Sequence, residues 1–81
     1  MSRARDVVEV VAKALADRPD AVRVTEREAK GQTFVELAMA PGDLGRVIGR
    51  QGRTANAVRT LVTLAAELDG TKATVDFRDD D

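Results

Sequence analysis

Apolar residues recur along this 81-residue chain with two different spacings, and each change of spacing marks a new element. Between Arg3 and Asp17 they recur every three or four residues, which is typical of a helix with one apolar face. Pro19 ends this helix, because the residue before a proline is pushed out of the helical region. The apolar face is expected to hold Val7, Val10, Val11, Ala14 and Leu15.

Two segments then alternate between apolar and polar residues, which predicts strands with one buried face. The first spans Ala21–Glu28, and a turn at Lys30-Gly31 follows it. The second spans Gln32–Ala40. The short connection predicts an antiparallel hairpin. The side chains expected on the buried face of the second strand are Val35, Leu37 and Met39.

Helical spacing returns after Pro41-Gly42, where Asp43 is expected to cap a short helix over Leu44–Ile48. A longer helix is predicted from Arg53 or Thr54 to Leu68, with Gly70 as its C-terminal cap. A last alternating segment spans Lys72–Arg78, and Asp79–Asp81 is expected to be a charged, frayed tail. Two helices separate the last strand from the one before it, so these strands are predicted to pair in parallel.

The predicted fold class is therefore α/β (α+β), as a two-layer sandwich with the order α-β-β-α-α-β. Residues 1–81 are expected to form a single domain, with a three-stranded mixed sheet under three helices. The long helix is apolar over an arc of roughly 200°, about twice what packing on one side requires. Packing against both the sheet and a neighbouring helix is one use for the excess. The other is self-association, centred on the Leu64 and Ala57 edge or on the Val62 and Ala66 edge.

The amino-acid composition limits the chemistry that the chain is expected to perform. The chain has no cysteine and no histidine, and its carboxylates form no catalytic or metal-binding pattern. We therefore expect no enzymatic activity, no cofactor and no metal. No 20-residue apolar span or signal peptide is present, so a cytoplasmic protein without a membrane partner is predicted. Phe34 and Phe77 are the only aromatic residues, too few for a platform on which bases stack.

The most informative stretch joins the two predicted helices at Gly49-Arg50-Gln51-Gly52. Glycine accepts positive φ and close approach of another backbone. A helix that begins after Gly52 aims unpaired N–H groups at the turn, which favours phosphate. Gly45 is expected to allow close packing of the short helix. From residue 44 to residue 66 there are four arginines and no carboxylate, namely Arg46, Arg50, Arg53 and Arg59, of which Arg59 is expected to be a solvated charge.

The segment Val47-Ile48-Gly49-Arg50-Gln51-Gly52-Arg53 resembles the V-I-G-x-x-G signature of KH domains, which bind single-stranded RNA or DNA. The order of elements is similar to that of the bacterial, type II KH fold. The length and the sequence after the loop resemble the KhpA (YlqC) family of small bacterial proteins with a single KH domain. That resemblance implies RNA binding, a homodimer, and pairing with a larger KH-containing RNA-binding protein. It implies an RNA-binding site at Arg46, Val47, Ile48, Gly49, Arg50, Gln51, Gly52 and Arg53.

The predicted function is thus binding of single-stranded RNA, as a non-catalytic regulator or RNA chaperone. The loop would clamp the backbone, and about four nucleotides would lie along a groove between the two predicted helices and the last strand. One of Val47 and Ile48 is expected to anchor the short helix in the core while the other lines the groove. Two alternatives stay open: a protein-interaction module with the same fold, and binding of single-stranded DNA in the same groove.

Overall fold

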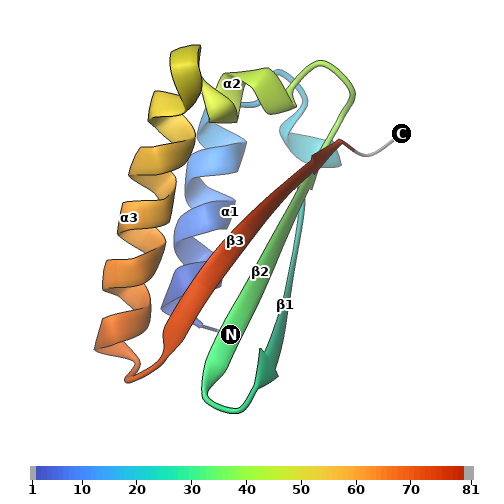
Figure 1. The fold of residues 1–81 in the computed structure, drawn as a ribbon. Coiled ribbons are helices and arrows are strands. Elements are labelled where there is room, and N and C mark those ends of the chain that lie inside the picture. The colour runs from blue at the N-terminus through green and yellow to red at the C-terminus, as the bar shows by residue number, and fades with distance from the viewer. Residues whose placement is uncertain (1, 80–81) are drawn as a thin grey trace.

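A computed structural model describes residues 2–79 and confirms the predicted order of elements, α-β-β-α-α-β. Three helices form one layer and a three-stranded sheet forms the other (Figure 1). Short 3-10 turns at Pro19–Ala21 and Arg50–Gly52 join neighbouring elements. In chain order the helices and strands are α1 Arg3–Leu15, β1 Arg23–Ala29, β2 Gln32–Met39, α2 Leu44–Ile48, α3 Arg53–Leu68 and β3 Lys72–Asp79.

The sheet has the predicted mixed topology, with strand order β1-β2-β3. β1 and β2 are antiparallel, and the turn between them places Lys30 and Gly31 at φ 53° and 77°. β2 and β3 are parallel, with Val35 opposite Val75 and Leu37 opposite Phe77. α2 and α3 supply the crossover, so they lie on the same face of the sheet as α1 (Figure 1).

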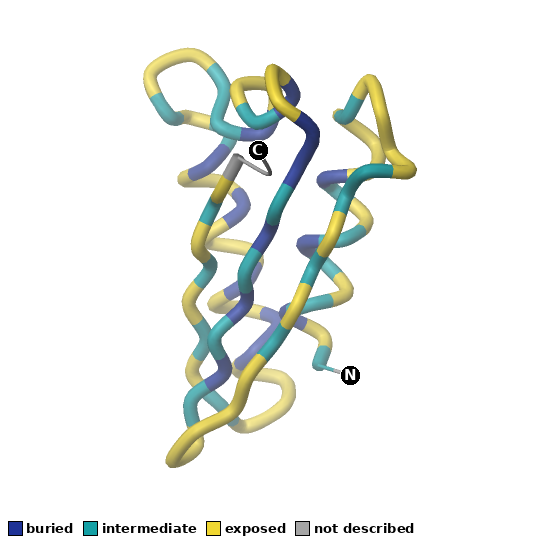
Figure 2. Tube along the Cα trace, turned by 90° about the vertical axis from the view of Figure 1, so that its right-hand side faces the viewer, coloured by how far each residue is buried: buried dark blue, intermediate teal, exposed yellow. Residues whose placement is uncertain are grey.

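The core lies between the sheet and the helices, and β2 crosses its centre. Buried and partly exposed residues alternate along this strand, as Figure 2 shows. α1 and α3 pack against each other, and both bury small residues that allow close approach. The buried core cluster consists of Ala4, Val8, Ala12, Val35, Leu37, Met39, Val47, Val58, Val62 and Ala66.

The apolar face predicted for α1 was wrong by about one residue. Ala4, Val8 and Ala12 are buried, whereas Val10 is 68% exposed and Leu15 is 38% exposed. The helix turns its alanines toward the interior because they let α1 lie close to α3, and Val10 then points to solvent. The prediction from periodicity relied on the larger apolar side chains, because alanine is only weakly apolar. It therefore placed the buried face on the neighbouring stripe of the helix.

Three smaller predictions also need correction. The first strand begins at Arg23 rather than Ala21, because Pro19–Ala21 forms a 3-10 turn. Asp43 precedes α2 but makes no capping hydrogen bond. Its buried carboxylate instead accepts the Arg18 N–H at 3.0 Å, a donor in the α1–β1 connection that would otherwise be unpaired. Asp79 ends β3 rather than starting a tail, and Asp80 and Asp81 lie outside the described residues.

Ser2 joins the start of α1 to the sheet. Its hydroxyl caps the helix by accepting the Arg5 N–H at 3.1 Å, and the same hydroxyl donates to Glu26 Oε2 at 2.7 Å. The Ser2 backbone N–H donates to the other oxygen of that carboxylate at 3.1 Å. These hydrogen bonds, from the hydroxyl first, lower the pKa of Glu26 from its ordinary value.

Candidate nucleic-acid interface

The loop between α2 and α3 needs its two glycines for different reasons. Gly49 has φ 75° and ψ 174°, a conformation open almost only to glycine. A Cβ on Gly49 would also lie 2.8 Å from the Cβ of Thr54, so α3 packs directly against this residue. Gly52 adopts a left-handed conformation with φ 72° and ψ 13°, and the space around it is open. The loop is therefore a fixed turn whose shape depends on both positions.

The side chains between and after the glycines point away from the core. Arg50, Gln51 and Arg53 are exposed, and Gln51 has positive φ of 58°. Arg53 Nη2 donates to Gln51 Oε1 at 3.2 Å, which leaves the Gln51 amide group free to donate. Two guanidinium groups and an amide thus stand at the positive end of the 16-residue α3. Such a cluster suits a phosphodiester oxygen.

Of the two residues before the loop, one anchors the short helix as predicted, and the groove-lining role of the other stays a prediction. Val47 is only 1% exposed and anchors α2 in the core, while Ile48 is half-buried beside the loop. Gly45 was expected to permit close packing, and this prediction was wrong because nothing lies within 4 Å of a Cβ placed there. Ile48 is therefore the apolar side chain of α2 that is left partly accessible next to Gly49.

Arg46 differs from the other three arginines of this region, because its charge is already paired. Arg46 Nη2 lies 2.9 Å from Asp17 Oδ2, and Arg46 Nε lies 3.7 Å from Asp43 Oδ1. Within the described part of the chain, no carboxylate pairs with Arg50, Arg53 or Arg59. The unneutralised charge therefore lies at the loop and along α3.

A groove lies between α3 and β3. One hollow of about 230 Å³ is lined by Arg59, Val62, Thr63, Ala73, Thr74 and Val75. A second, of about 760 Å³, shares Thr63, Ala73 and Thr74 and continues to Gly31 and Gly70 at the far end. β3 is the last strand of the sheet, so its outer backbone groups have no neighbouring strand. The groove thus offers apolar walls and unpaired backbone groups, which suit unstacked bases.

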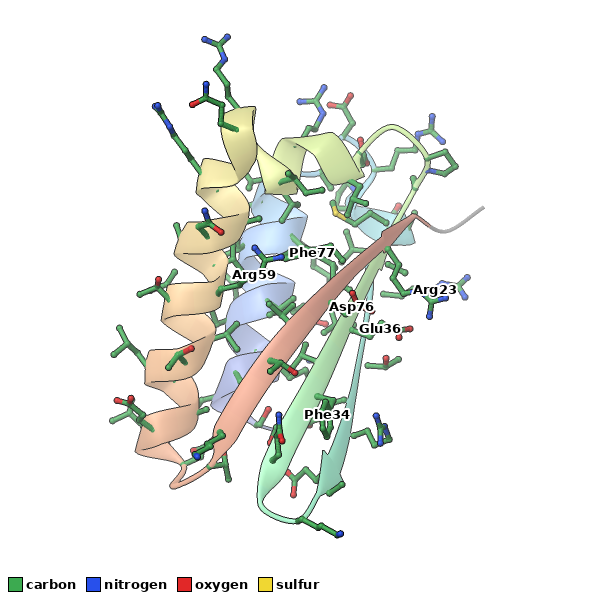
Figure 3. The ribbon with its side chains drawn as sticks, in the orientation of Figure 1. Arg23, Phe34, Glu36, Arg59, Asp76 and Phe77 are labelled. Carbon is green, nitrogen blue, oxygen red and sulfur yellow. The ribbon has the colours of Figure 1, made fainter. Side chains whose placement is uncertain are left out.

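Arg59 is a residue of this groove that sequence reasoning missed. It was expected to be a solvated charge, and it is exposed, but its guanidinium also lies over the Phe77 ring, 5.2 Å from the centroid (Figure 3). Arg59 Nη1 also donates to Asn56 Oδ1 at 3.1 Å. The available signal was the spacing of Asn56, Arg59 and Thr63 at i, i+3 and i+7, which places them on one edge of the helix.

Across residues 2–79, no three acidic side chains come together as a group that could hold a metal ion. No helix in that range combines the length and the apolar character needed to cross a membrane.

Comparison with known sequences gives a consistent result. The family model described as "KhpA/KhpB, KH domain" matches residues 5–77. A protein named RNA-binding protein KhpA from Caldanaerobacter subterraneus is 52% identical over 61 residues, covering 75% of this chain and 81% of that protein. The protein of the same name from Leifsonia xyli is 50% identical over 70 residues, covering 86% and 90%. The one from Clostridium perfringens is 42% identical over 73 residues, covering 90% and 97%.

Among solved structures, the chain is similar to Era from Aquifex aeolicus, crystallised as a variant bound to GDP and aluminium fluoride. The TM-score is 0.62 at 15% sequence identity, and the match covers 94% of this chain but 29% of Era. At that identity the likeness concerns the fold alone.

Proposed function

The chain belongs to the KhpA/KhpB KH-domain family, and from this premise we propose that it binds single-stranded RNA through the Gly49–Gly52 loop and the α3–β3 groove. The observation that carries the proposal is the loop itself. Its glycine-dependent turn presents unpaired arginines beside the N-terminus of α3. A cytoplasmic location and a non-catalytic role, as regulator or chaperone, are part of the same proposal.

In this proposal the loop binds the RNA backbone. Arg50 contributes a charge-assisted hydrogen bond to a phosphate, and the Gln51 amide donates to a phosphate or sugar oxygen. Arg53 adds a second cation, and the first turn of α3 adds its dipole. Gly49 and Gly52 act by shape, because Gly49 lets the turn pack against α3 and Gly52, with open space around it, lets the RNA backbone approach closely. Arg46 contributes less, since Asp17 already offsets its charge.

The bases then lie in the groove, about four of them for a single domain of this kind. Val62 and Val75 line the groove, and in this proposal the half-buried Ile48 extends its apolar surface toward the loop. The free edge of β3 supplies N–H and C=O groups to base edges. Because few phosphates are contacted, the affinity of one domain is low, and a second copy or partner raises it through effective concentration.

Self-association on α3 supplies that second copy. Leu61, Leu64 and Leu68 are 46%, 53% and 75% exposed, and Ala57 is exposed on the same side. The alternative edge, at Val62 and Ala66, is buried in the core and is not a docking surface. We propose that the exposed edge forms a homodimer or receives a larger KH-containing protein. This edge also supports the second candidate function, a protein-interaction module.

The test replaces both loop side chains with Asp. The Arg50→Asp/Gln51→Asp protein keeps both glycines, and Asp tolerates the positive φ of position 51. Its control is Ala29→Asp/Lys30→Asp, which makes the same change of charge at the β1–β2 turn, at the opposite end of the molecule (Figure 1). Asp-Gly is a favoured hairpin sequence, so the control also folds.

We expect the loop variant to bind single-stranded RNA at least tenfold more weakly, because one charge-assisted contact is worth about 1.5–3 kcal/mol. The control stays within about twofold, because salt screens charges beyond about 8 Å. Both proteins keep the circular dichroism spectrum of the wild type. A folded loop variant that binds RNA as well as wild type contradicts the proposal. Equal binding of a matched DNA oligomer would show that the groove does not read the 2′-hydroxyl.

A further inference from the structure

The contact between Arg59 and Phe77 bridges the two walls of the groove. Arg59 projects from α3 toward Phe77 on β3, and Figure 3 shows the two side chains lying toward each other. Asn56 Oδ1 accepts from Nη1 of Arg59 at 3.1 Å, which holds the guanidinium from a second direction. Two contacts thus restrain a long, flexible and exposed side chain before any ligand binds, so less conformational entropy is lost on binding than for an unrestrained arginine.

The fixed guanidinium still has donors available. Nη1 is used by Asn56, whereas Nε and Nη2 have no recorded partner among the described side chains. These two groups lie on one edge of the guanidinium and point the same way, as a two-pronged donor. No carboxylate lines the hollow in which Arg59 lies, so nothing acidic competes for that edge.

A second arginine–phenylalanine pair shows by contrast what makes this place suitable. Arg27 lies over Phe34, 4.6 Å from the ring centroid, in a hollow on the open face of the sheet. Glu36 and Asp76 line that hollow and repel a nucleic-acid backbone (Figure 3). Instead, no carboxylate lines the Arg59 hollow, which shares Thr63, Ala73 and Thr74 with the larger hollow between α3 and β3.

We propose that Arg59, held by Phe77 and Asn56, is a specificity-determining residue that reads one base in the groove. Its free edge pairs fully with a base that presents two adjacent acceptors. Guanine does so with O6 and N7, and cytosine with O2 and N3. Uracil and adenine present no two adjacent acceptors, because each acceptor lies beside an N–H donor or a C–H group, so they satisfy only half of the edge. The inference rests on the proposed RNA binding and adds a base preference to it.

The experiment compares fluorescein-labelled RNA octamers by anisotropy at one low salt concentration. One octamer is all uridine, and three others carry a single guanosine, cytidine or adenosine at the centre. Because the groove holds about four nucleotides, each octamer can shift to place its distinct base against Arg59. Wild type is expected to bind the guanosine or the cytidine octamer about five- to tenfold more tightly than the uridine and adenosine octamers.

Two lysine variants distinguish recognition of the base from electrostatic attraction to the RNA backbone. Arg59→Lys keeps the cation but removes the two-pronged edge, so the preference should fall to within about twofold while affinity for the uridine octamer changes little. Arg50→Lys should weaken all four octamers alike and keep the preference. Phe77→Leu keeps an apolar side chain, removes the ring, and should reduce the preference in a protein shown by melting to be folded.

The outcomes are distinct. Equal wild-type binding to all four octamers overturns the base-reading role and leaves RNA binding intact. A preference that survives in Arg59→Lys also overturns it, because another group must then read the base. Absence of binding to every octamer overturns the proposed function and this inference together.

Discussion

Of three glycine-to-alanine substitutions in α2 and the loop after it, we expect one to raise the stability of the fold and two to lower it. Gly45, Gly49 and Gly52 lie within eight residues of one another, yet their conformations and surroundings differ. Gly49→Ala combines a backbone region that costs about 1–3 kcal/mol for other residues with a Cβ placed 2.8 Å from the Thr54 Cβ. Since α3 must shift to relieve that contact, we expect a loss of about 3 kcal/mol or more.

The substitutions at the other two glycines serve as comparisons for the change in stability. Gly52→Ala meets open space but keeps positive φ, so it should cost about 1–2 kcal/mol. Gly45→Ala lies in helical backbone with nothing within 4 Å, so it should stabilise the protein by about 0.5–1 kcal/mol. The order of stability is therefore Gly45→Ala, wild type, Gly52→Ala and then Gly49→Ala.

Thermal and urea unfolding by circular dichroism measure these differences. In a domain of this size 1 kcal/mol shifts Tm by about 4–8 °C, so Gly49→Ala should melt at least about 12 °C below wild type. The stability lost in Gly49→Ala is a large part of the total free energy of unfolding, which is roughly 4–12 kcal/mol for a domain of this size. A Gly49→Ala protein that melts within about 3 °C of wild type would refute the described loop conformation. So would a Gly45→Ala protein as unstable as Gly49→Ala.

Three further predictions concern salt, pH and assembly. If two to four phosphates are contacted, a plot of log K for RNA against log[salt] should have a slope of about −1.5 to −3, and a flat plot would exclude phosphate binding. Glu26→Gln should lower the free energy of unfolding at pH 7. Because folding lowers the pKa of Glu26, the difference from wild type should vanish as pH falls below the ordinary value of 4.5 and through the folded value, as urea midpoints at several pH values would show. Leu64→Asp should give a folded monomer by sedimentation, whereas Val62→Asp should unfold the chain; a wild type that is monomeric at high concentration would remove the homodimer.

Much of the fold follows from local patterns. The bounds of α2 and α3 were predicted because Asp43, the glycine loop and Gly70 mark their ends in the sequence. The buried face of β2 was predicted because successive side chains of a strand point to opposite faces, so strict alternation of apolar and polar residues identifies a single apolar face. α1 was harder, since two neighbouring stripes are both apolar and only its partner helix decides between them. Local sequence does not contain that partner.

The candidate site divides in the same way. The loop was found because glycine and arginine requirements lie within a few consecutive residues. Arg59 was not, because its surroundings depend on β3, which approaches α3 only after the crossover is complete. The predicted site residues, the single-domain assignment of residues 1–81, the homodimer and the partner protein stay predictions that the binding and sedimentation experiments address.

The alanines buried on α1 affect more than packing density. Ala4 and Ala12 are fully buried on α1, and their small side chains allow a short distance between α1 and α3. α3 is also one wall of the groove. A bulkier side chain at either position would displace α3 relative to β3 and change the width of the groove. Substitutions at buried positions that never contact nucleic acid would then change affinity. Related chains can in this way diverge in ligand preference while every contacting residue stays the same.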